Sequence, residues 1–478
     1  MQHRFFRLWR QAIFAIALLF TLQTTAQPVI TYHNKDVEES SKYKKGNEYQ
    51  KDFLLFMDML QTTHPAFEKN PPFNVKKELK KGYTHCGKCK NLQEFVFYTQ
   101  QVAAKIHDEH TSTYFQYAAD WVYPFYFYID ENGFYPIKIQ KGMESSLGKQ
   151  ITKINGKDLS TICNKFKSFY SVGNEAGFKK TFMVNGVYFF PWHELGLCEP
   201  DSSLNLSFSD GSSLKLRPVP ANFKNWSIIQ STPSPVEQMR RSAMKRPFSY
   251  KILDEGICYL LFDKCQDAGT MKSQSSLNPI PFFTDFLNEM FQDMKEKNVN
   301  KLVVDVRYNG GGNSSLCNEL LSRLKSSITS TRTEVRPSQL AIDNYKAQGI
   351  DPSFLYNSTS NHNVWQSKVP PFDGKVIWIQ GQRTFSSAGL LITFAVDNNI
   401  GTVIGEPASY SPNHYGDKIQ WNLPNTNIQG CISHKYFIRP DETRGDEIPL
   451  AKTLTTSFED YVNGIDPCYD WATDPAHF

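Results

Sequence analysis

The segment Lys301–Asn313, which reads KLVVDVRYNGGGN, decides the fold that we expect. Its first half is an apolar, β-branched run interrupted only by Asp305, which is typical of a strand buried in a parallel sheet. Three consecutive glycines follow. Because glycine loses more backbone entropy on folding than other residues, we expect this run to have a specific role. Glycines permit positive φ and leave N–H groups bare for close approach to a ligand oxygen. The loop is therefore predicted to be an anion-binding cradle or part of an oxyanion hole, with a plain strand-to-helix turn as the alternative.

Strands and helices alternate on both sides of this segment. We expect strands at 256–263, 376–380 and 402–406 and helices at 281–297, 313–324 and 390–396. Successive βαβ units with right-handed crossovers give a parallel sheet. Ligands of such sheets collect beyond the carboxyl ends of the strands. Two loops meet this condition, the glycine loop and the one that begins at Gly381.

The stretch Gly381–Asn399 reads GQRTFSSAGLLITFAVDNN and places two serines between a strand and a helix. These serines are either helix caps or include a nucleophile. Serine alone is a poor nucleophile, so the second interpretation requires a base and an oxyanion site elsewhere in the chain.

Other common sites are not indicated. A phosphate-binding loop needs Gly-Lys-Ser/Thr, but Gly312 is followed by Asn313. The sequence HELGL at 193–197 is not the HExxH of a zinc protease. The sequence HCGKC at 85–89 has no second ligand pair, so a local disulfide or two plain thiols is preferred to a metal. No metal and no organic cofactor are expected.

The first 26 residues predict a secretory signal peptide cleaved after Ala26, with an uncleaved membrane anchor as the alternative. Removal of Arg4, Arg7 and Arg10 lowers the formal net charge from +4 to +1, which excludes a basic excess for nucleic acid or anionic membranes. No later run is apolar enough to cross a membrane, so we expect an exported protein, periplasmic or extracellular. Its nine cysteines are an odd number, so at least one thiol stays unpaired if others form disulfides.

The chain before the α/β part divides into two further regions. Residues 27–124 predict helices near 53–60 and 92–106, the second followed by His110 and a strand TSTYFQY at 111–117. Residues 125–225 are β-rich, and LGKQITKINGKDLSTI at 147–162 reads as a strand, an Asn-Gly turn and a helix. This segment resembles part of a PDZ domain, with an unrelated β-insert as the alternative. Residues 226–478 form the predicted catalytic core.

Three motifs in this order resemble the signature of the C-terminal-processing and tricorn-type serine peptidases. They are LVVDVRYNGGGN at 302–313, TFSSAG at 384–389 and TVIGEPAS at 402–409. Asp-Glu-His-Thr at 108–111 resembles the family's Asp-Gly-His-Thr, and THPAF at 63–67 is similar to its helical cap. The resemblance covers most of residues 92–478. It implies an α/β fold with a crotonase/ClpP-like core and a mostly parallel sheet, an N-terminal helical cap and a PDZ-like β-rich domain.

The resemblance also implies roles for individual residues. Ser386 takes the nucleophile position, and the backbone N–H groups of Ser387 and Gly311 take the oxyanion positions. Processing-type members use a lysine 25 residues beyond the serine, but Ser411 stands there in this sequence. Tricorn-type members use a histidine instead, at the position of His110. Imidazole titrates near neutrality and suits a base that later returns its proton.

A carboxylate is expected to orient that histidine. The resemblance places it downstream of the nucleophile, where Asp441 is preferred and Glu442, Asp446 and Glu447 are alternatives. The predicted function is that of a serine-type endopeptidase or other serine peptidase, acting on peptides or unfolded chain ends. An α/β-hydrolase-type esterase with His477 as base is a rival, although FSSAG lacks the first glycine of G-x-S-x-G. The other rival is an inactive peptide-binding protein of the same fold.

Overall fold

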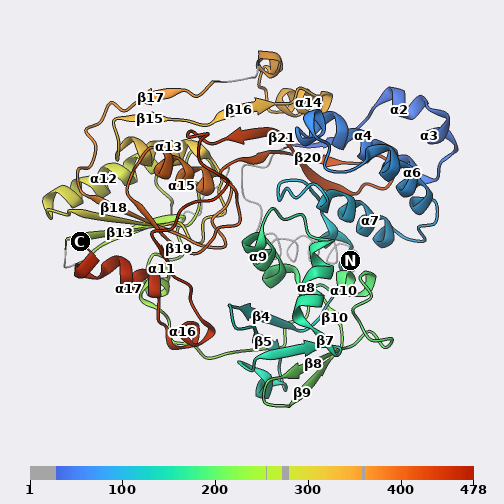
Figure 1. The fold of residues 1–478 in the computed structure, drawn as a ribbon, viewed down its shortest axis with the longest axis horizontal. Helices are drawn as coiled ribbons and strands as arrows, with labels where there is room; N and C mark the ends of the chain where they lie inside the picture. The colour runs from blue at the N-terminus through green and yellow to red at the C-terminus, as the bar shows by residue number, and fades with distance from the viewer. Residues whose placement is uncertain (1–27, 254–255, 272–278, 358–360, 478) are drawn as a thin grey trace, which may run out of the picture.

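A long β-hairpin near the C-terminus joins the parts of this chain (Figure 1). The computed structural model describes residues 28–253, 256–271, 279–357 and 361–477. The predicted signal peptide at 1–26 therefore lies outside the described residues. Within these ranges no helix has the length and apolar character needed to cross a membrane.

The catalytic part is built on a six-stranded sheet. In spatial order its strands are β12 (Phe248–Leu253), β13 (Ile257–Phe262), β14 (Lys301–Asp305), β18 (Lys375–Gln380), β19 (Thr402–Gly405) and β22 (Lys452–Thr453). All neighbouring strands are parallel except β12 and β13. The predicted parallel sheet is confirmed, with one antiparallel edge strand.

Side chains of β14 alternate between two cores, which explains its continuous apolar sequence. Leu302 and Val304 pack with helices α12 (Phe283–Glu296), α13 (Ser314–Ser322) and α15 (Ser387–Asp397). Val303 packs on the opposite side with α11 (Pro235–Ser242) and α17 (Pro467–Thr473). Helices therefore cover both faces of this sheet, and the predicted helices at 281–297 and 313–324 correspond to α12 and α13.

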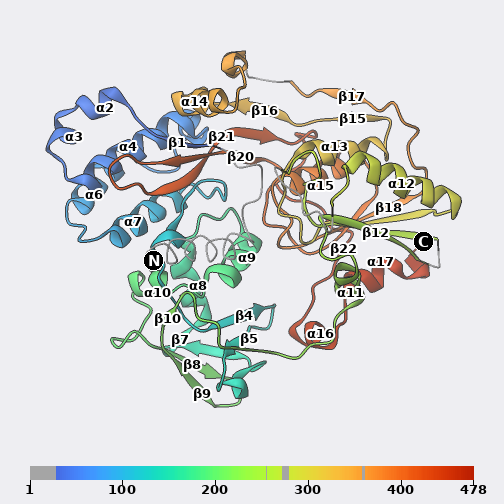
Figure 2. The ribbon, with the colours of Figure 1, turned by 180° about the vertical axis from the view of Figure 1, so that it is seen from behind.

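A second sheet brings distant parts of the chain together. The hairpin of β20 (His414–Asn422) and β21 (Gln429–Ile438) lies between β1 (Val29–Thr31) and β16 (Arg332–Val335), and β2 (Ser112–Thr113) also pairs with β21. Figures 1 and 2 show this hairpin running from the catalytic part to the N-terminal helices. Because β2 pairs with β21, the hairpin places the segment that follows His110 beside the catalytic part of the chain.

The N-terminal part is helical, as predicted. Its helices are α2 (Lys35–Glu39), α3 (Ser41–Lys45), α4 (Glu48–Thr63), α5 (Ala66–Lys69), α6 (Val75–Cys86) and α7 (Leu92–Ala104). Asn47 closes a capping box at the start of α4, and Asn91 caps α7. The predicted helices near 53–60 and 92–106 are therefore confirmed, although α4 begins five residues earlier, at Glu48.

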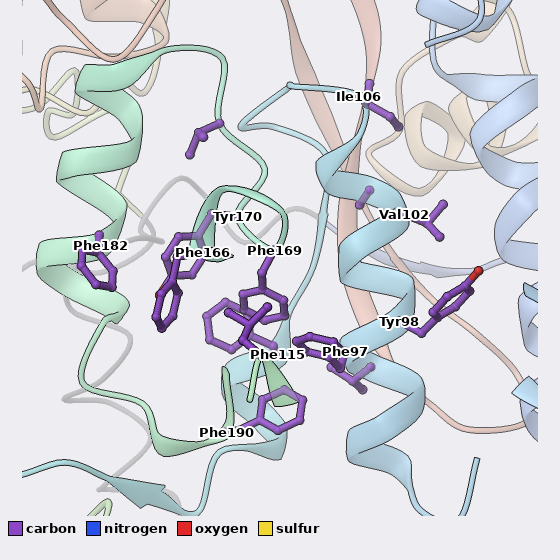
Figure 3. Close-up of a cluster of buried hydrophobic side chains, with 14 of the residues drawn as sticks. Phe97, Tyr98, Val102, Ile106, Phe115, Phe166, Phe169, Tyr170, Phe182 and Phe190 are labelled. Carbon is purple, nitrogen blue, oxygen red and sulfur yellow. The ribbon is translucent and has the colours of Figure 1, made fainter. Parts of the chain in front are cut away.

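The predicted strand at 111–117 is wrong beyond its first residues. Only Ser112 and Thr113 pair as β2, and the chain then turns into the 3₁₀ helix η2 (Phe115–Ala118). The Phe115 side chain turns inward to contact Phe169 and Tyr170 at ring-centroid distances of 4.9 and 6.2 Å. Figure 3 shows this aromatic cluster between α7 and the middle part of the chain. Burial of the phenyl ring outweighs the local β propensity.

The middle part contains a seven-stranded antiparallel sheet and helices. The sheet consists of β4 (Phe125–Ile129), β5 (Phe134–Gln140), β6 (Ile151–Ile154), β7 (Lys157–Asp158), β8 (Leu204–Phe208), β9 (Ser213–Leu216) and β11 (Trp226–Ile228). Asn155 and Gly156 have φ of 51° and 69°, as the predicted tight hairpin turn requires. The helices are α8 (Leu159–Lys167), α9 (Glu175–Asn185) and α10 (Phe189–Glu194), of which the sequence predicted only α8. The likeness to a PDZ domain stays a prediction.

Shorter elements complete the described chain. They are β3 (Trp121–Val122), β10 (Val219–Pro220), β15 (Ser327–Thr329), β17 (Val364–Gln366), α14 (Gln339–Ala347), α16 (Phe458–Asn463) and the 3₁₀ helices η3 (Glu144–Ser146), η4 (Pro352–Asn357) and η5 (Pro475–His477). All nine cysteines are free thiols. The expected choice at Cys86 and Cys89 therefore falls on two plain thiols.

Candidate active site

The two loops singled out in the sequence meet at the carboxyl ends of β14 and β18. Thr384 connects them, because its hydroxyl accepts from the Gly381 N–H at 3.0 Å and donates to the Val306 carbonyl at 2.8 Å. A backbone bond from Phe385 N–H to the Asn309 carbonyl, at 3.0 Å, adds a second link. The hydroxyl of Thr384 is thus used for structure, and Ser386 is held beside the glycine loop.

Ser386 stands at a sharp strand-to-helix turn. Its φ of 54° and ψ of −127° are rare for a residue with a side chain, and such a conformation costs about 1–3 kcal/mol. It precedes the first residue of α15, yet its side chain makes no capping hydrogen bond. The Oγ atom instead lies 3.2 Å from Nε2 of His110. Of the two interpretations of these serines, the geometry at Ser386 therefore matches a nucleophile rather than a cap.

His110 is 92 % buried and is held from both sides of its ring. Its Nδ1 lies 3.1 Å from the backbone carbonyl of Tyr415 on β20. A carbonyl oxygen only accepts, so Nδ1 carries the proton and Nε2 is left as the acceptor for the Ser386 hydroxyl. The imidazole also stacks on Phe385, with centroids 4.5 Å apart and planes inclined by 22°. This tautomer is the one that a general base requires.

Asp108 is the carboxylate nearest to this histidine. Its Oδ1 accepts from the His110 backbone N–H at 3.0 Å and lies 3.8 Å from His110 Nδ1. Oδ2 accepts from the hydroxyls of Thr111 and Ser433, both at 2.6 Å. Burial acts to raise the pKa of Asp108, but the bonds and charges of His110 and His64 hold it well below its ordinary value. This lowered pKa favours the ionised carboxylate, which is placed where it can interact with a positive charge on the His110 ring.

A second histidine fixes Asp108 from the far side. The Nδ1 atom of His64 accepts from the Ala66 N–H at 3.2 Å, so its Nε2 carries the proton and donates to Asp108 Oδ2 at 3.2 Å. The ring is fully buried. Sequence reasoning assigned no role to Asp108 or His64. Both nevertheless lie in stretches that carry the family resemblance, Asp-Glu-His-Thr at 108–111 and THPAF at 63–67.

The two loops that meet at the carboxyl ends of β14 and β18 lie in a segment that matches a known protein family. Residues 279–423, which include Ser386 and the glycine loop, match the profile of Peptidase family S41. This region belongs to peptidase family S41. A search of curated proteins by sequence gives no significant match.

Solved structures show a similar fold over nearly the whole of this chain. Mature CPAF complexed with lactacystin is 12% identical with a TM-score of 0.62, over 88% of this chain and 96% of that one. Mature CPAF alone is 12% identical with a TM-score of 0.62, over 92% and 97%. A point mutant of CPAF is 12% identical with a TM-score of 0.59, over 88% and 95%. At this identity the likeness concerns the fold.

Asp305 and Arg307, the Asp-x-Arg pair of the motif, immediately precede the glycine loop in the sequence. The Arg307 guanidinium bonds to Asp305 and, with two contacts of 2.8 Å, to Asp466 at the start of α17. Burial acts to raise the pKa of Asp305, but Arg307 and Arg240 lower it to about 2. This buried ion cluster ties the C-terminal helix α17 to the end of β14 and thereby fixes the start of the loop.

Gly311 packs directly on Ser386, but its backbone N–H already has an acceptor. Its φ is +97°, and a Cβ there would lie 2.7 Å from the Ser386 Cβ. The Gly311 N–H donates to Asn309 Oδ1 at 2.9 Å, so in this conformation it does not point to an oxyanion. Ser387 is the first residue of α15, and its N–H has no acceptor within its own helix. The Ser387 hydroxyl donates to the Gly312 carbonyl at 2.7 Å and holds the loop in place.

Among the described residues, Asp441 has no hydrogen bond or ion pair to His110, so its role as the orienting acid stays a prediction. The Asp441 carboxylate accepts from Thr443 and Arg444, at 2.6 and 3.0 Å, and the residue follows β21 on an exposed loop. The hydrogen bonds of the Asp441 carboxylate are therefore made to residues two and three positions further along the chain.

Two of the three alternative acids pair with other side chains, and the third is exposed. Glu442 pairs with Arg332 at 3.2 Å, and Asp446 accepts from Asn413. Glu447 is exposed, and its backbone carbonyl accepts from the Arg439 guanidinium at 3.3 Å. His477, the base that an esterase would need, stacks on Trp471 with centroids 4.3 Å apart. Among the described residues, none of these groups has a hydrogen bond or ion pair to His110.

Proposed function

We propose that this S41 peptidase is exported and hydrolyses peptide bonds in peptides or unfolded chain ends by a serine mechanism with a histidine base. One observation carries the proposal. Ser386 and His110, distant in the sequence, lie with Oγ and Nε2 3.2 Å apart, and Tyr415 holds the imidazole in the proton-accepting tautomer.

The reaction follows from this geometry. His110 Nε2 takes the proton of Ser386 as Oγ attacks the scissile carbonyl, and returns it to the leaving amine. Asp108 stabilises the imidazolium through space at 3.8 Å, in place of Asp441. The Ser387 N–H at the start of α15 stabilises the tetrahedral oxyanion, aided by the helix dipole. Gly311 contributes a second N–H only if Asn309 releases it.

A fluorophosphonate probe tests this function. Wild-type protein should be labelled, and Ser386→Ala should abolish the label. The matched control is Ser353→Ala, which removes an exposed hydroxyl of η4 and should leave labelling unchanged. Lactacystin, which is bound in a CPAF structure, serves as a second probe. An unlabelled wild type would support the inactive peptide-binding alternative, and turnover of esters without peptides would support an esterase.

Export is tested separately by the mature N-terminus. The segment before Gln27 carries the signal-peptide pattern, and N-terminal sequencing of the exported protein should begin at that residue. Retention of residues 1–26 on a membrane-bound product would favour the uncleaved anchor instead.

A further inference from the structure

One ammonium group from the middle part of the chain contacts the surroundings of both reacting side chains. Lys180 of α9 lies with Nζ 2.5 Å from Glu109 Oε2 and 2.9 Å from Ser409 Oγ. The same nitrogen lies over the ring of Phe385, 4.3 Å from its centroid. Glu109 immediately precedes His110, and Phe385 immediately precedes Ser386.

Through Phe385 these contacts reach His110, the candidate base. The Phe385 ring contacts both groups: Lys180 Nζ lies 4.3 Å from its centroid, and the centroid of the His110 imidazole lies 4.5 Å from it. Ser409 contacts the Thr384 carbonyl at 3.4 Å, so the third partner of Lys180 also touches the nucleophile turn. A cation over an aromatic face is attracted by the ring quadrupole, more strongly where water is excluded.

The Glu109–Lys180 ion pair is mostly buried, and the neighbouring backbone leaves room for its carboxylate. The Glu109 side chain is 9% exposed and that of Lys180 is 20% exposed. Burial raises the pKa of the Glu109 carboxyl, and the Lys180 charge opposes that rise. The second Glu109 oxygen lies against Gly177, where a Cβ would approach it to 2.0 Å. A glycine in the first turn of α9 therefore makes room for this carboxylate.

Helix α9 has a further link to the same loop. Asn174, which caps α9, donates from Nδ2 to the Ala408 carbonyl at 3.0 Å. Lys180 and Asn174 thus dock one face of α9 on residues 408–410, near the position where processing-type members carry their lysine. Lys180 is not a substitute for that base, because its ammonium is held by the Glu109 carboxylate and has no lone pair to offer.

We propose that Lys180 is a positioning residue. It holds Phe385 and Glu109, and through them it keeps Ser386 Oγ and His110 Nε2 at hydrogen-bond distance. The middle part of the chain thereby supplies a piece of the active site rather than only a neighbouring module. This inference rests on the proposed serine mechanism.

Kinetics of Lys180→Met on a peptide substrate test the proposal. We expect kcat and the rate of fluorophosphonate labelling to fall by about 10²-fold, the loss typical of a reacting group displaced by about 1 Å, while KM changes little. Lys179→Met, one residue earlier in α9, is the matched control and should retain wild-type kinetics, because the described contacts to Glu109 and Phe385 come from Lys180.

The double variant Glu109→Gln/Lys180→Met separates positioning from charge compensation. Lys180→Met alone leaves a buried carboxylate without its partner and should lower the Tm, and the double variant should restore the Tm but not kcat. Recovery of kcat in the double variant would overturn the proposal, because Lys180 would then act only by neutralising Glu109. Wild-type kcat in Lys180→Met would overturn it as well. An unlabelled wild type would instead contradict the proposed function itself.

Discussion

The backbone carbonyl of Tyr415 lies 3.1 Å from His110 Nδ1, so the tautomer of the candidate base is set by the β20–β21 hairpin rather than by a carboxylate. A side-chain acid is then left with an electrostatic role. Asp108 fits that role, since its Oδ1 is 3.8 Å from Nδ1, too far for a hydrogen bond but close enough for a charge interaction.

The first prediction concerns that division of labour. Asp108→Asn removes the charge and keeps the shape, and we expect kcat to fall by about 10²-fold. A carboxylate that also fixes the tautomer costs about 10⁴-fold when it is replaced by the amide. Steady-state kinetics measure the difference. Asp441→Asn is the matched control and should retain wild-type kcat. A larger loss in Asp441→Asn than in Asp108→Asn would return the acid role to the downstream loop.

The glycine loop offers a pair of neighbouring substitutions. Gly311→Ala places a methyl group 2.7 Å from the Ser386 Cβ at a φ of +97°, so labelling by a fluorophosphonate should be lost. The left-handed conformation alone costs about 1–2 kcal/mol for a residue with a side chain. Gly310→Ala is the control, because a Cβ there meets no atom within 4 Å. Equal labelling of the two variants would show that the loop adjusts freely.

Much of the catalytic fold was predictable, because continuous apolar strands and amphipathic helices carry their own periodicity. The strand before the glycine loop and the helix after Ser386 were both found in this way. The β20–β21 hairpin was not, since its pairing with β1 and β2 depends on contacts between residues hundreds of positions apart. The acid that accompanies His110 could not be chosen from the sequence for the same reason. Asp108 stands two residues before His110, and its bond to Ser433, 325 positions away, appears only in the tertiary structure.

The buried ion cluster should contribute strongly to stability. Arg307 bonds to Asp305 and Asp466 with side-chain exposures of 12%, 0% and 8%. Arg307→Met removes the guanidinium that both buried carboxylates share and leaves Asp305 with Arg240 at 3.7 Å, and breaking a buried pair in this way costs about 3–5 kcal/mol. Denaturant unfolding measures the loss. Arg241→Met breaks an exposed pair with Glu237 and should change stability little. Equal midpoints for the two variants would contradict the role given to the cluster.

Two buried histidines predict how stability depends on pH. Burial lowers the pKa of His414 and of His434 to about 4, well below the value of about 6.5 in an unfolded chain. Between these values the unfolded chain binds more protons than the folded one, so the free energy of unfolding should fall as the pH decreases from about 6.5 to about 4. Chemical denaturation across this range measures the slope. His434→Gln removes one of the two groups and should flatten it, whereas His33→Gln, an exposed residue near the N-terminus, should not. An unchanged slope in His434→Gln would mean that this imidazole is already protonated in the folded protein.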